Sequence, residues 1–440
     1  MHKIMTAGAV GLLLSVPLSS QAAVSEAEVA ELRQQVQALL ERVQQLETRN
    51  AELAGSGTAA PAVRMEALEV RVAEVEEAND RQSDQMAQAA VQAKKVDWAS
   101  KIKWKGDMRY RHEMIDEESR DTRTRHRIRI RTGLEAKVSD SMTAYVGIAT
   151  GDPEDPRSTN VTLGGGNVRK SLGIDYGYLA WRPTESTALS LGKMKYPFER
   201  FGGSLFYDGD VNPEGGALQF RASNGVFVNG YGFWITESSG GADANLLGAQ
   251  LGWESPFGLM IAATYNDYGA IQYNSLGISL DSSEPLGGNS YYLAGTSCSG
   301  AGTTACYLYD YDIVEVGAEY AFSLGRWPMK AWVNYLRNTA VDDLNEGYNI
   351  GFVLGKASNP GSWELAALYQ DVERDAQWAG VIDSDFAGGT TQGKGMQFKG
   401  AWVPVKNVAV NLTWFENTRN YDTARERDYQ RLQLDLSMKF

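Results

Sequence analysis

Histidine, cysteine and proline are scarce in this 440-residue chain, which contains three His, two Cys and 12 Pro. Only His112 and His126 lie beyond the first few residues, so catalysis that depends on histidine is not expected. Two cysteines are too few for a disulfide scaffold or for the usual Cys-based zinc sites. The formal net charge of −13 argues against a nucleic-acid partner, because proteins that bind nucleic acids carry a basic surface. We therefore expect no catalytic residue, no metal and no cofactor.

Long apolar runs are also lacking, apart from one at the N-terminus. The run from Ala7 to Leu18 follows Lys3 and precedes Ser20-Gln21-Ala22, a small–x–small pattern typical of a cleavage site. This run is too short to span a bilayer as a helix, which takes about 20 apolar residues. Residues 1–22 are therefore predicted to be a signal peptide, with a buried helix as the alternative. Export would permit disulfides to form.

Two segments before residue 98 have the 3,4 spacing of apolar residues that is typical of coiled coils. Residues 23–54 form the first, with Val at a and Leu at d positions, and residues 63–97 form a weaker second. Residues 55–62, which contain Gly55, Gly57 and Pro61, are predicted to be a flexible linker. The heptad positions are Val29, Leu32, Val36, Leu39, Val43, Leu46, Asn50 and Leu53, then Met65, Leu68, Val72, Val75, Asn79, Gln82, Met86 and Ala89. Both helices need partners, either in other chains or in an intrachain antiparallel hairpin.

From residue 98 onward the apolar period changes from 3.5 to 2. In the last strand, for example, Leu432, Leu434 and Leu436 alternate with polar residues. Such alternation indicates strands that face different solvents on their two sides. Sixteen such segments can be placed between residues 98 and 440, and the gaps between them alternate between seven short turns and eight long loops. This pattern is typical of a transmembrane antiparallel β-barrel of about 16 strands.

A soluble β-sandwich or propeller is the alternative, because alternation alone does not say which face is inside. The signal peptide, the loop asymmetry, the terminal Phe440 and aromatic residues near strand ends favour the membrane barrel. The aromatic residues are Trp98, Trp104, Tyr176, Tyr178, Trp181, Trp253, Trp327, Trp332, Trp363, Trp402 and Trp414. Outer-membrane-type barrels of 16 to 18 strands leave an aqueous channel.

If the apolar residues face lipid, two neighbouring strands place a basic wall on the water-filled lumen. Its residues are Lys103, Lys105, Arg109, Arg111, Arg123, Arg125, Arg127, Arg129 and Arg131. Such a wall would raise the local concentration of anions and bias permeation toward them. Two other interpretations remain: the arginines pair only with nearby acids such as Asp107, Glu113 and Glu135, or Arg123 and Arg125 lie above the membrane and bind lipopolysaccharide phosphates.

The third long loop is rich in acids and would narrow the lumen if it folded inward opposite the basic wall. Its candidate constriction residues are Glu199, Arg200, Asp208, Asp210 and Glu214, with an ordinary solvated loop as the alternative. Cys298 and Cys306 have seven residues between them in the longest loop, and we expect a local disulfide. Because the closed loop is short, this disulfide would constrain the loop and not the barrel.

Several motifs resemble the bacterial "putative porin" family. They are Lys105 to Arg111 (KGDMRYR), Arg123 to Arg129 (RTRHRIR), Gly147 to Gly151 (GIATG), Leu191 to Met194 (LGKM) with Pro197-Phe198, and Asp208 to Gly215 (DGDVNPEG). The resemblance covers residues 98–440 and is most specific in the first 120 of them. It implies a sixteen-stranded porin of the bacterial outer membrane, usually a homotrimer in lipid and lipopolysaccharide, with the coiled coil in the periplasm.

The resemblance implies passive diffusion of small hydrophilic solutes and ions through a water-filled channel, and no enzymatic reaction. The basic wall adds the expectation that anions are favoured. The alternative is a structural tether in which the coiled coil links the outer membrane to the periplasm or the peptidoglycan. An outer-membrane enzyme would need a nucleophile–base pair, and the chain has no G-x-S-x-G motif. Val at a with Leu at d favours two-stranded coiled coils, whereas the resemblance favours a trimer, so both states stay open.

Overall fold

A computed structural model describes residues 37, 40–49, 70–87, 101–239, 242–276, 280, 284–293 and 305–440. The chain divides into two compact units, residues 1–92 and residues 93–440. The predicted signal peptide, the predicted linker and most of the heptad positions lie outside the described residues.

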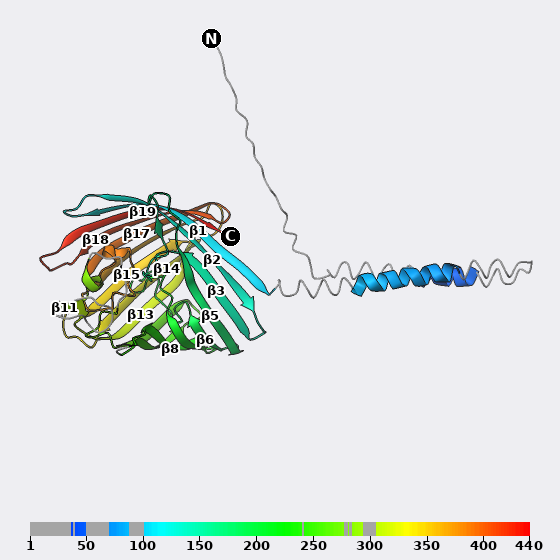
Figure 1. The fold of residues 1–440 in the computed structure, drawn as a ribbon, viewed down its shortest axis with the longest axis horizontal. Coiled ribbons are helices and arrows are strands. Elements are labelled where there is room, and N and C mark those ends of the chain that lie inside the picture. The colour runs from blue at the N-terminus through cyan, green and yellow to red at the C-terminus, as the bar shows by residue number, and fades with distance from the viewer. Residues whose placement is uncertain are drawn as a thin grey trace, which may run out of the picture. The chain divides into compact units, whose positions relative to one another are not determined.

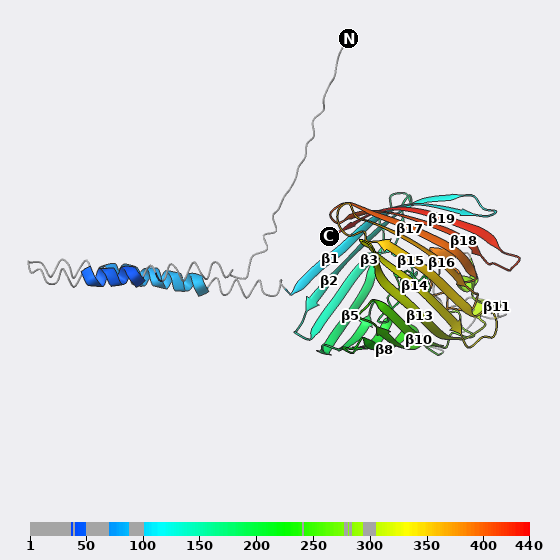
Figure 2. The same ribbon diagram turned by 180° about the vertical axis from the view of Figure 1, so that it is seen from behind.

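The second unit is a closed antiparallel barrel of sixteen strands, as the alternation predicts (Figures 1 and 2). β1 pairs with β2 and also with β19, from Asp107↔Lys439 to Glu117↔Tyr429, so the first and last strands close the barrel. The barrel strands are β1 (Ile102–Glu117), β2 (Arg123–Lys137), β3 (Met142–Thr150), β5 (Leu172–Thr184), β6 (Thr187–Lys193), β7 (Glu214–Arg221), β8 (Val226–Thr236), β9 (Ala244–Glu254), β10 (Leu259–Gly269), β13 (Tyr311–Leu324), β14 (Trp327–Asn338), β15 (Glu346–Gly355), β16 (Trp363–Val372), β17 (Gly393–Val405), β18 (Val408–Arg419) and β19 (Arg427–Lys439).

The connections alternate in length along the barrel. Seven short turns lie at the end of the barrel where β1 begins and β19 ends, and eight longer loops lie at the other end. The long loops carry small elements of their own: β4 (Val161–Thr162), the 3₁₀ turn η1 (Pro285–Gly288), β11 (Tyr291–Leu293), β12 (Ala305–Tyr307) and the 3₁₀ turn η2 (Phe386–Gly388). β4 pairs with β2 through Arg127↔Thr162, which holds the second long loop against that strand.

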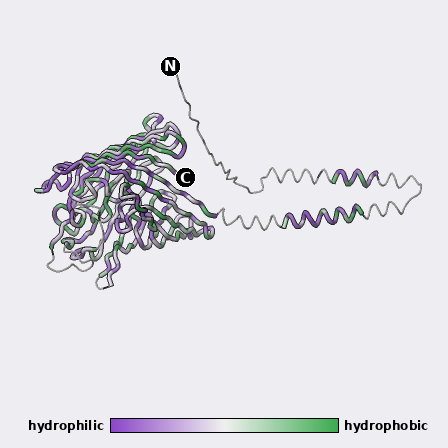
Figure 3. The backbone as a smooth tube through the Cα atoms, turned by 45° about the horizontal axis from the view of Figure 1, so that its top comes forward, coloured by the Kyte–Doolittle hydropathy of each residue, from purple (hydrophilic) through white to green (hydrophobic). Residues whose placement is uncertain are grey.

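Large apolar side chains on the strands are exposed on one face, and polar side chains of the same strands are buried on the other. Hydrophilic and hydrophobic residues are accordingly mixed along the barrel strands (Figure 3). Leu247, Leu251 and Ile350 are more than half exposed, whereas the neighbouring Gln250 and Asn349 are 2% and 0% exposed. This is the reverse of a water-soluble core, and it matches a barrel whose outer face meets lipid and whose inner face meets water.

Residues 40–49 and 70–87 of the first unit are helical, and all their described side chains are exposed. Val43 and Leu46, at heptad positions, are 49% and 57% exposed. The coiled coil itself therefore stays a prediction. Within the described residues, no helix combines the length and the hydrophobicity that crossing a bilayer requires.

Candidate functional site

The barrel interior is partly filled by the third long loop, residues 194–213, which follows β6. Phe201 and Phe206 of this loop are fully buried against the inner face of the barrel. Gly202 has a φ of +52°, and a Cβ placed on it would lie 2.0 Å from Cδ2 of Trp332 on β14. Only glycine satisfies both the left-handed backbone and this close approach. Trp332 is consequently 4% exposed and faces inward, which corrects its expected place in the aromatic girdle.

Polar contacts hold the third long loop to the barrel wall between β9 and β16. The Tyr207 hydroxyl donates to Oε2 of Glu315 at 2.8 Å and accepts from Nδ2 of Asn266 at 3.0 Å. Backbone N–H groups of Gly202 and Leu205 donate to side chains on β13 and β16. Since buried polar groups need hydrogen-bond partners, these side chains hold the loop in one position against the barrel wall.

The seventh long loop, residues 373–392, also folds into the lumen and joins the third. The Asp208 N–H donates to the carbonyl of Val381 at 2.6 Å, and the Asp383 N–H donates to the carbonyl of Leu205 at 3.0 Å. From the second long loop, the 1%-exposed side chain of Arg157 donates Nη1 to the carbonyl oxygens of Ala379 and Gly389. Three loops thus form one packed body inside the barrel.

Six arginine side chains on the inner faces of β1, β2 and β19 share five carboxylates, and Arg127 lies beside them on β2. Arg111 binds both oxygens of Asp435 through Nε and Nη2 at 2.7 and 2.8 Å. Arg129 and Arg131 bind Asp107 at 2.7 and 2.8 Å. The six arginines are Arg109, Arg111, Arg125, Arg129, Arg131 and Arg431, and the carboxylates are those of Asp107, Glu113, Asp210, Asp385 and Asp435. Arg127 donates instead to the Ser158 hydroxyl.

The other members of the predicted basic wall lie apart from this cluster. Lys103 and Lys105 are exposed near the short turns, where both ammonium groups pair with Glu135 at 3.1 and 3.6 Å. Arg123 lies at the opposite end of the wall, at the start of β2, and is exposed. The structure therefore places arginines 109 to 131 on one continuous inner surface, whereas the two lysines form a separate pair with Glu135.

The predicted acidic residues of the third long loop are divided between different partners. Asp210 reaches the basic wall, where Oδ1 lies 3.2 Å from Nη1 of Arg131. Asp208 is 5% exposed and accepts a hydrogen bond from the Ser384 N–H of the seventh long loop. Glu199 pairs with Arg221. Two further candidates do not contact the basic wall. Arg200 donates to the carbonyl of Tyr207 within the same loop, and Glu214, the first residue of β7, pairs with Lys193.

The loop carboxylates differ in how the interior affects their ionisation. Burial raises the pKa of Asp208 well above its usual range, and the carboxylates of Asp383 and Asp210 raise it further. Burial alone would also raise the pKa of Asp385, but the charges of Arg431 and Arg111 outweigh it and hold the pKa below its usual value. Asp385 is therefore a firmly charged link between the seventh long loop and the basic wall.

Sequence reasoning did not assign a role to Asp385, Arg431 or Asp435. Arg431 lies 2.5 Å from Glu113 on β1 and 2.6 Å from Asp385. The sequence did contain a signal for these partners, because in a closed barrel the last strand lies beside the first. Arg431, Gln433 and Asp435 are spaced two residues apart and therefore share one face of that last strand. His126, which alternates with the arginines along β2, faces outward, with its ring 5.0 Å from that of His112.

The expected disulfide falls partly outside the described residues. Cys306 lies in β12, is fully buried and is disulfide-bonded. Cys298 lies outside the described residues, so the pairing stays a prediction.

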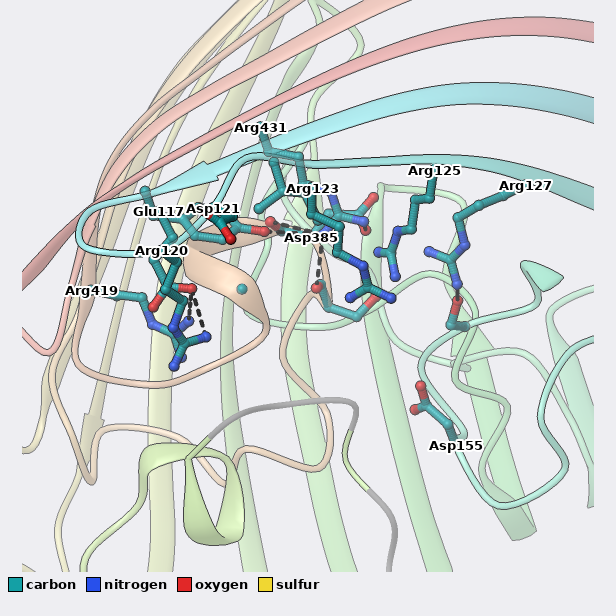
Figure 4. A pocket seen from close by; sticks show the side chains of 15 residues that line it. Glu117, Arg120, Asp121, Arg123, Arg125, Arg127, Asp155, Asp385, Arg419 and Arg431 are labelled. Atoms are coloured by element: carbon teal, nitrogen blue, oxygen red, sulfur yellow. Dashed lines mark hydrogen bonds and ion pairs between the residues drawn. The ribbon is translucent and has the colours of Figure 1, made fainter. Parts of the chain in front are cut away.

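A cavity of about 370 Å³ lies beside the basic wall near the long-loop end of the barrel (Figure 4). Arg125 and Arg127 point into it from β2, and Asp385 and Arg431 border it. Its lining residues are Ile115, Glu117, Arg120, Asp121, Arg123, Arg125, Arg127, Asp155, Ser158, Ser384, Asp385, Gly388, Arg419, Tyr429 and Arg431. Within the described residues, no group of three or more His, Cys, Asp or Glu side chains is arranged to hold a metal ion.

Comparison with known proteins agrees with this architecture. The family model described as "Putative porin" matches residues 116–275 and 307–440. OprB of Pseudomonas putida, in a high-pH structure, has a similar fold, with a TM-score of 0.53 and 11% identity over 78% of this chain and 95% of that chain. A variant of Rh. blastica porin with five substitutions aligns over 77% of this chain and 100% of that chain, with 13% identity and a TM-score of 0.45. No curated protein is a significant sequence match.

Proposed function

Because this chain belongs to the family described as "Putative porin", we propose that it forms a water-filled channel for passive diffusion of small hydrophilic solutes and ions across the bacterial outer membrane. The observation that carries the proposal is a closed sixteen-strand barrel that is apolar outside and charged inside. Guanidinium and carboxylate groups on an inner wall need ion-pair partners or water, and a water-filled channel supplies the water.

The third and seventh long loops narrow this channel and make its two sides unlike. The basic wall lies on β1, β2 and β19, while the loops cover the inner face of β13 to β16 with aromatic and amide side chains. Solutes would pass between a charged surface and a largely neutral one. A constriction of this kind selects by size and by charge.

We infer a preference for anions from the balance of charge on the basic wall. Seven buried or half-buried arginines face five carboxylates, and Arg123 adds a further positive charge at the long-loop end. A wall with surplus positive charge raises the local concentration of anions over that of cations. The preference is modest, because most of the arginines are paired.

We also propose a homotrimer, which the family resemblance implies, in a membrane of lipid and lipopolysaccharide. The exposed apolar outer face requires a hydrophobic surrounding, either lipid or the equivalent face of another copy.

The test is ion conductance of the full mature protein in a planar bilayer under a salt gradient. Discrete conductance steps are expected, in groups of three for a trimer, with a reversal potential whose sign shows anion preference. The variant Arg129→Gln should shift the reversal potential toward cation preference, whereas Lys137→Gln, at the far end of the same strand, should shift it less. A folded barrel without conductance would refute the channel, and a cation-selective reversal potential would refute the anion preference alone.

A further inference from the structure

The cavity at the long-loop end of the basic wall is lined by three arginines from one strand. Arg123, Arg125 and Arg127 alternate along β2 on the face that carries the wall, and all three line the cavity (Figure 4). Alternate residues of a strand lie about 7 Å apart. The strand thus presents a row of guanidinium groups to a space of about 370 Å³.

Arg127 is buried, and it forms no ion pair with any carboxylate of the described residues. It is 6% exposed, and its Nη2 donates only to neutral groups, the Ser158 hydroxyl at 3.3 Å and the Asn160 carbonyl at 3.2 Å. Its Nε is buried and donates to nothing within the described residues. Burying a cation without a counter-charge is costly, so an anion in the cavity would stabilise Arg127.

Glu113 and Asp385 act on Arg127 only from beyond ion-pair distance, because other arginines already bind most of the carboxylates around the cavity. Glu117 binds Arg120, Arg419 and Arg427, and Asp155 accepts from the backbone of Arg157. Asp385 binds Arg111 and Arg431, and Glu113 binds Arg125. Asp121 is exposed to solvent in the loop between β1 and β2.

We propose that this cavity is a binding subsite for small divalent oxyanions of the phosphate and sulfate class, a stopping point for such solutes in the channel. This inference rests on the proposed function. The two negative charges of such an anion would balance the positive charges of Arg123 and Arg127. Guanidinium groups recognise tetrahedral oxyanions through paired N–H donors. The Ser158 hydroxyl, which also lines the cavity, would offer a further polar contact.

The same chemistry could be supplied by a lipid phosphate, and the structure favours the free anion. The three arginines lie on the inner face of β2, together with the buried Glu113 of β1, and not on the apolar face that meets lipid. Titration of inorganic phosphate into the folded barrel in a detergent without phosphate groups separates the two sources, because no lipid phosphate is then present.

The experiment measures inorganic phosphate binding in two ways, on the full mature protein. Isothermal titration calorimetry uses the folded barrel in detergent, and block of the chloride current by added phosphate uses planar bilayers. Saturable binding is expected, and Arg127→Gln should weaken it about tenfold, as expected for loss of one charge-assisted contact. Lys137→Gln, which removes a charge paired with Asp140 at the far end of β2, is the matched control and should bind as the parent does.

The variant Arg127→Lys separates a binding subsite from a general positive field. It keeps the charge and therefore the reversal potential, but it loses the planar fork, so phosphate affinity should fall. Equal affinity in the parent, Arg127→Lys and Arg127→Gln would overturn the proposal, as would no phosphate binding to the folded parent. Absence of conductance with retained phosphate binding would refute the channel and leave the subsite intact. A conducting channel that does not bind phosphate would refute the subsite and leave the channel intact.

Discussion

The Tyr207 hydroxyl is predicted to hold the third long loop against the barrel wall. It bridges two strands, since it donates to Glu315 on β13 at 2.8 Å and accepts from Asn266 on β10 at 3.0 Å. All three residues are at most 3% exposed, so water does not replace the bonds while the loop stays in place. Tyr207→Phe keeps the ring and its packing and removes both hydrogen bonds.

The magnitude follows from these two bonds. One neutral bond and one bond to a carboxylate together contribute about 2–4 kcal/mol. That energy corresponds to a change of about 30- to 900-fold in the equilibrium between the attached and the detached loop. Detachment would alter the free cross-section of the channel, so it would be visible as fluctuation of the ionic current.

Tyr196→Phe is the matched control, because Tyr196 lies in the same loop and its buried hydroxyl has no hydrogen-bond partner within the described residues. Single-channel recordings of parent, Tyr207→Phe and Tyr196→Phe are compared at the same voltage and salt. Only Tyr207→Phe should show more frequent and longer current fluctuations, and its loop should be cleaved faster by protease. If the two variants fluctuate alike, the hydroxyl of Tyr207 does not hold the loop.

Three further outcomes are expected. Gly202→Ala should also loosen the third long loop, because a φ of +52° costs an alanine about 1–2 kcal/mol and the added Cβ would overlap Trp332. Faster cleavage of the loop by protease is the expected result, and an unchanged cleavage rate would contradict it. Asp385 has a lowered pKa, so its stabilising link to Arg431 is complete above its ordinary pKa of 3.8 and weakens as the pH falls below that value. Current noise should therefore rise below about pH 3.8 in the parent, and Asp385→Asn should be noisy at neutral pH and lack this acid transition. Deletion of residues 23–97 should leave the single-channel conductance unchanged, because β1 and β19 close the barrel without them; loss of conductance in a folded deletion variant would show that the N-terminal segment is part of the channel.

Much of the barrel could be predicted from local pattern. The period-2 alternation and the turn lengths predict the number of barrel strands, because each strand must present apolar side chains to lipid and polar ones to water. The arginines of β2 and their common face follow from the same periodicity. The neighbours of these arginines did not follow so directly, since Asp435 and Arg431 are more than 300 residues away from Arg111 and Glu113 along the chain.

Local sequence pattern is sufficient to predict about sixteen alternating strands, unequal turns and one basic face, because these features depend on side chains a few residues apart. Entry of the third and seventh long loops into the lumen depends on the closed barrel, since the residues that hold these loops come from strands β8 to β17. Barrel closure also sets which arginines form ion pairs and leaves Arg127 without one within the described residues. A loop carries no periodicity that points to its partner, and a charge is paired or unpaired according to what barrel closure brings within a few ångströms of it.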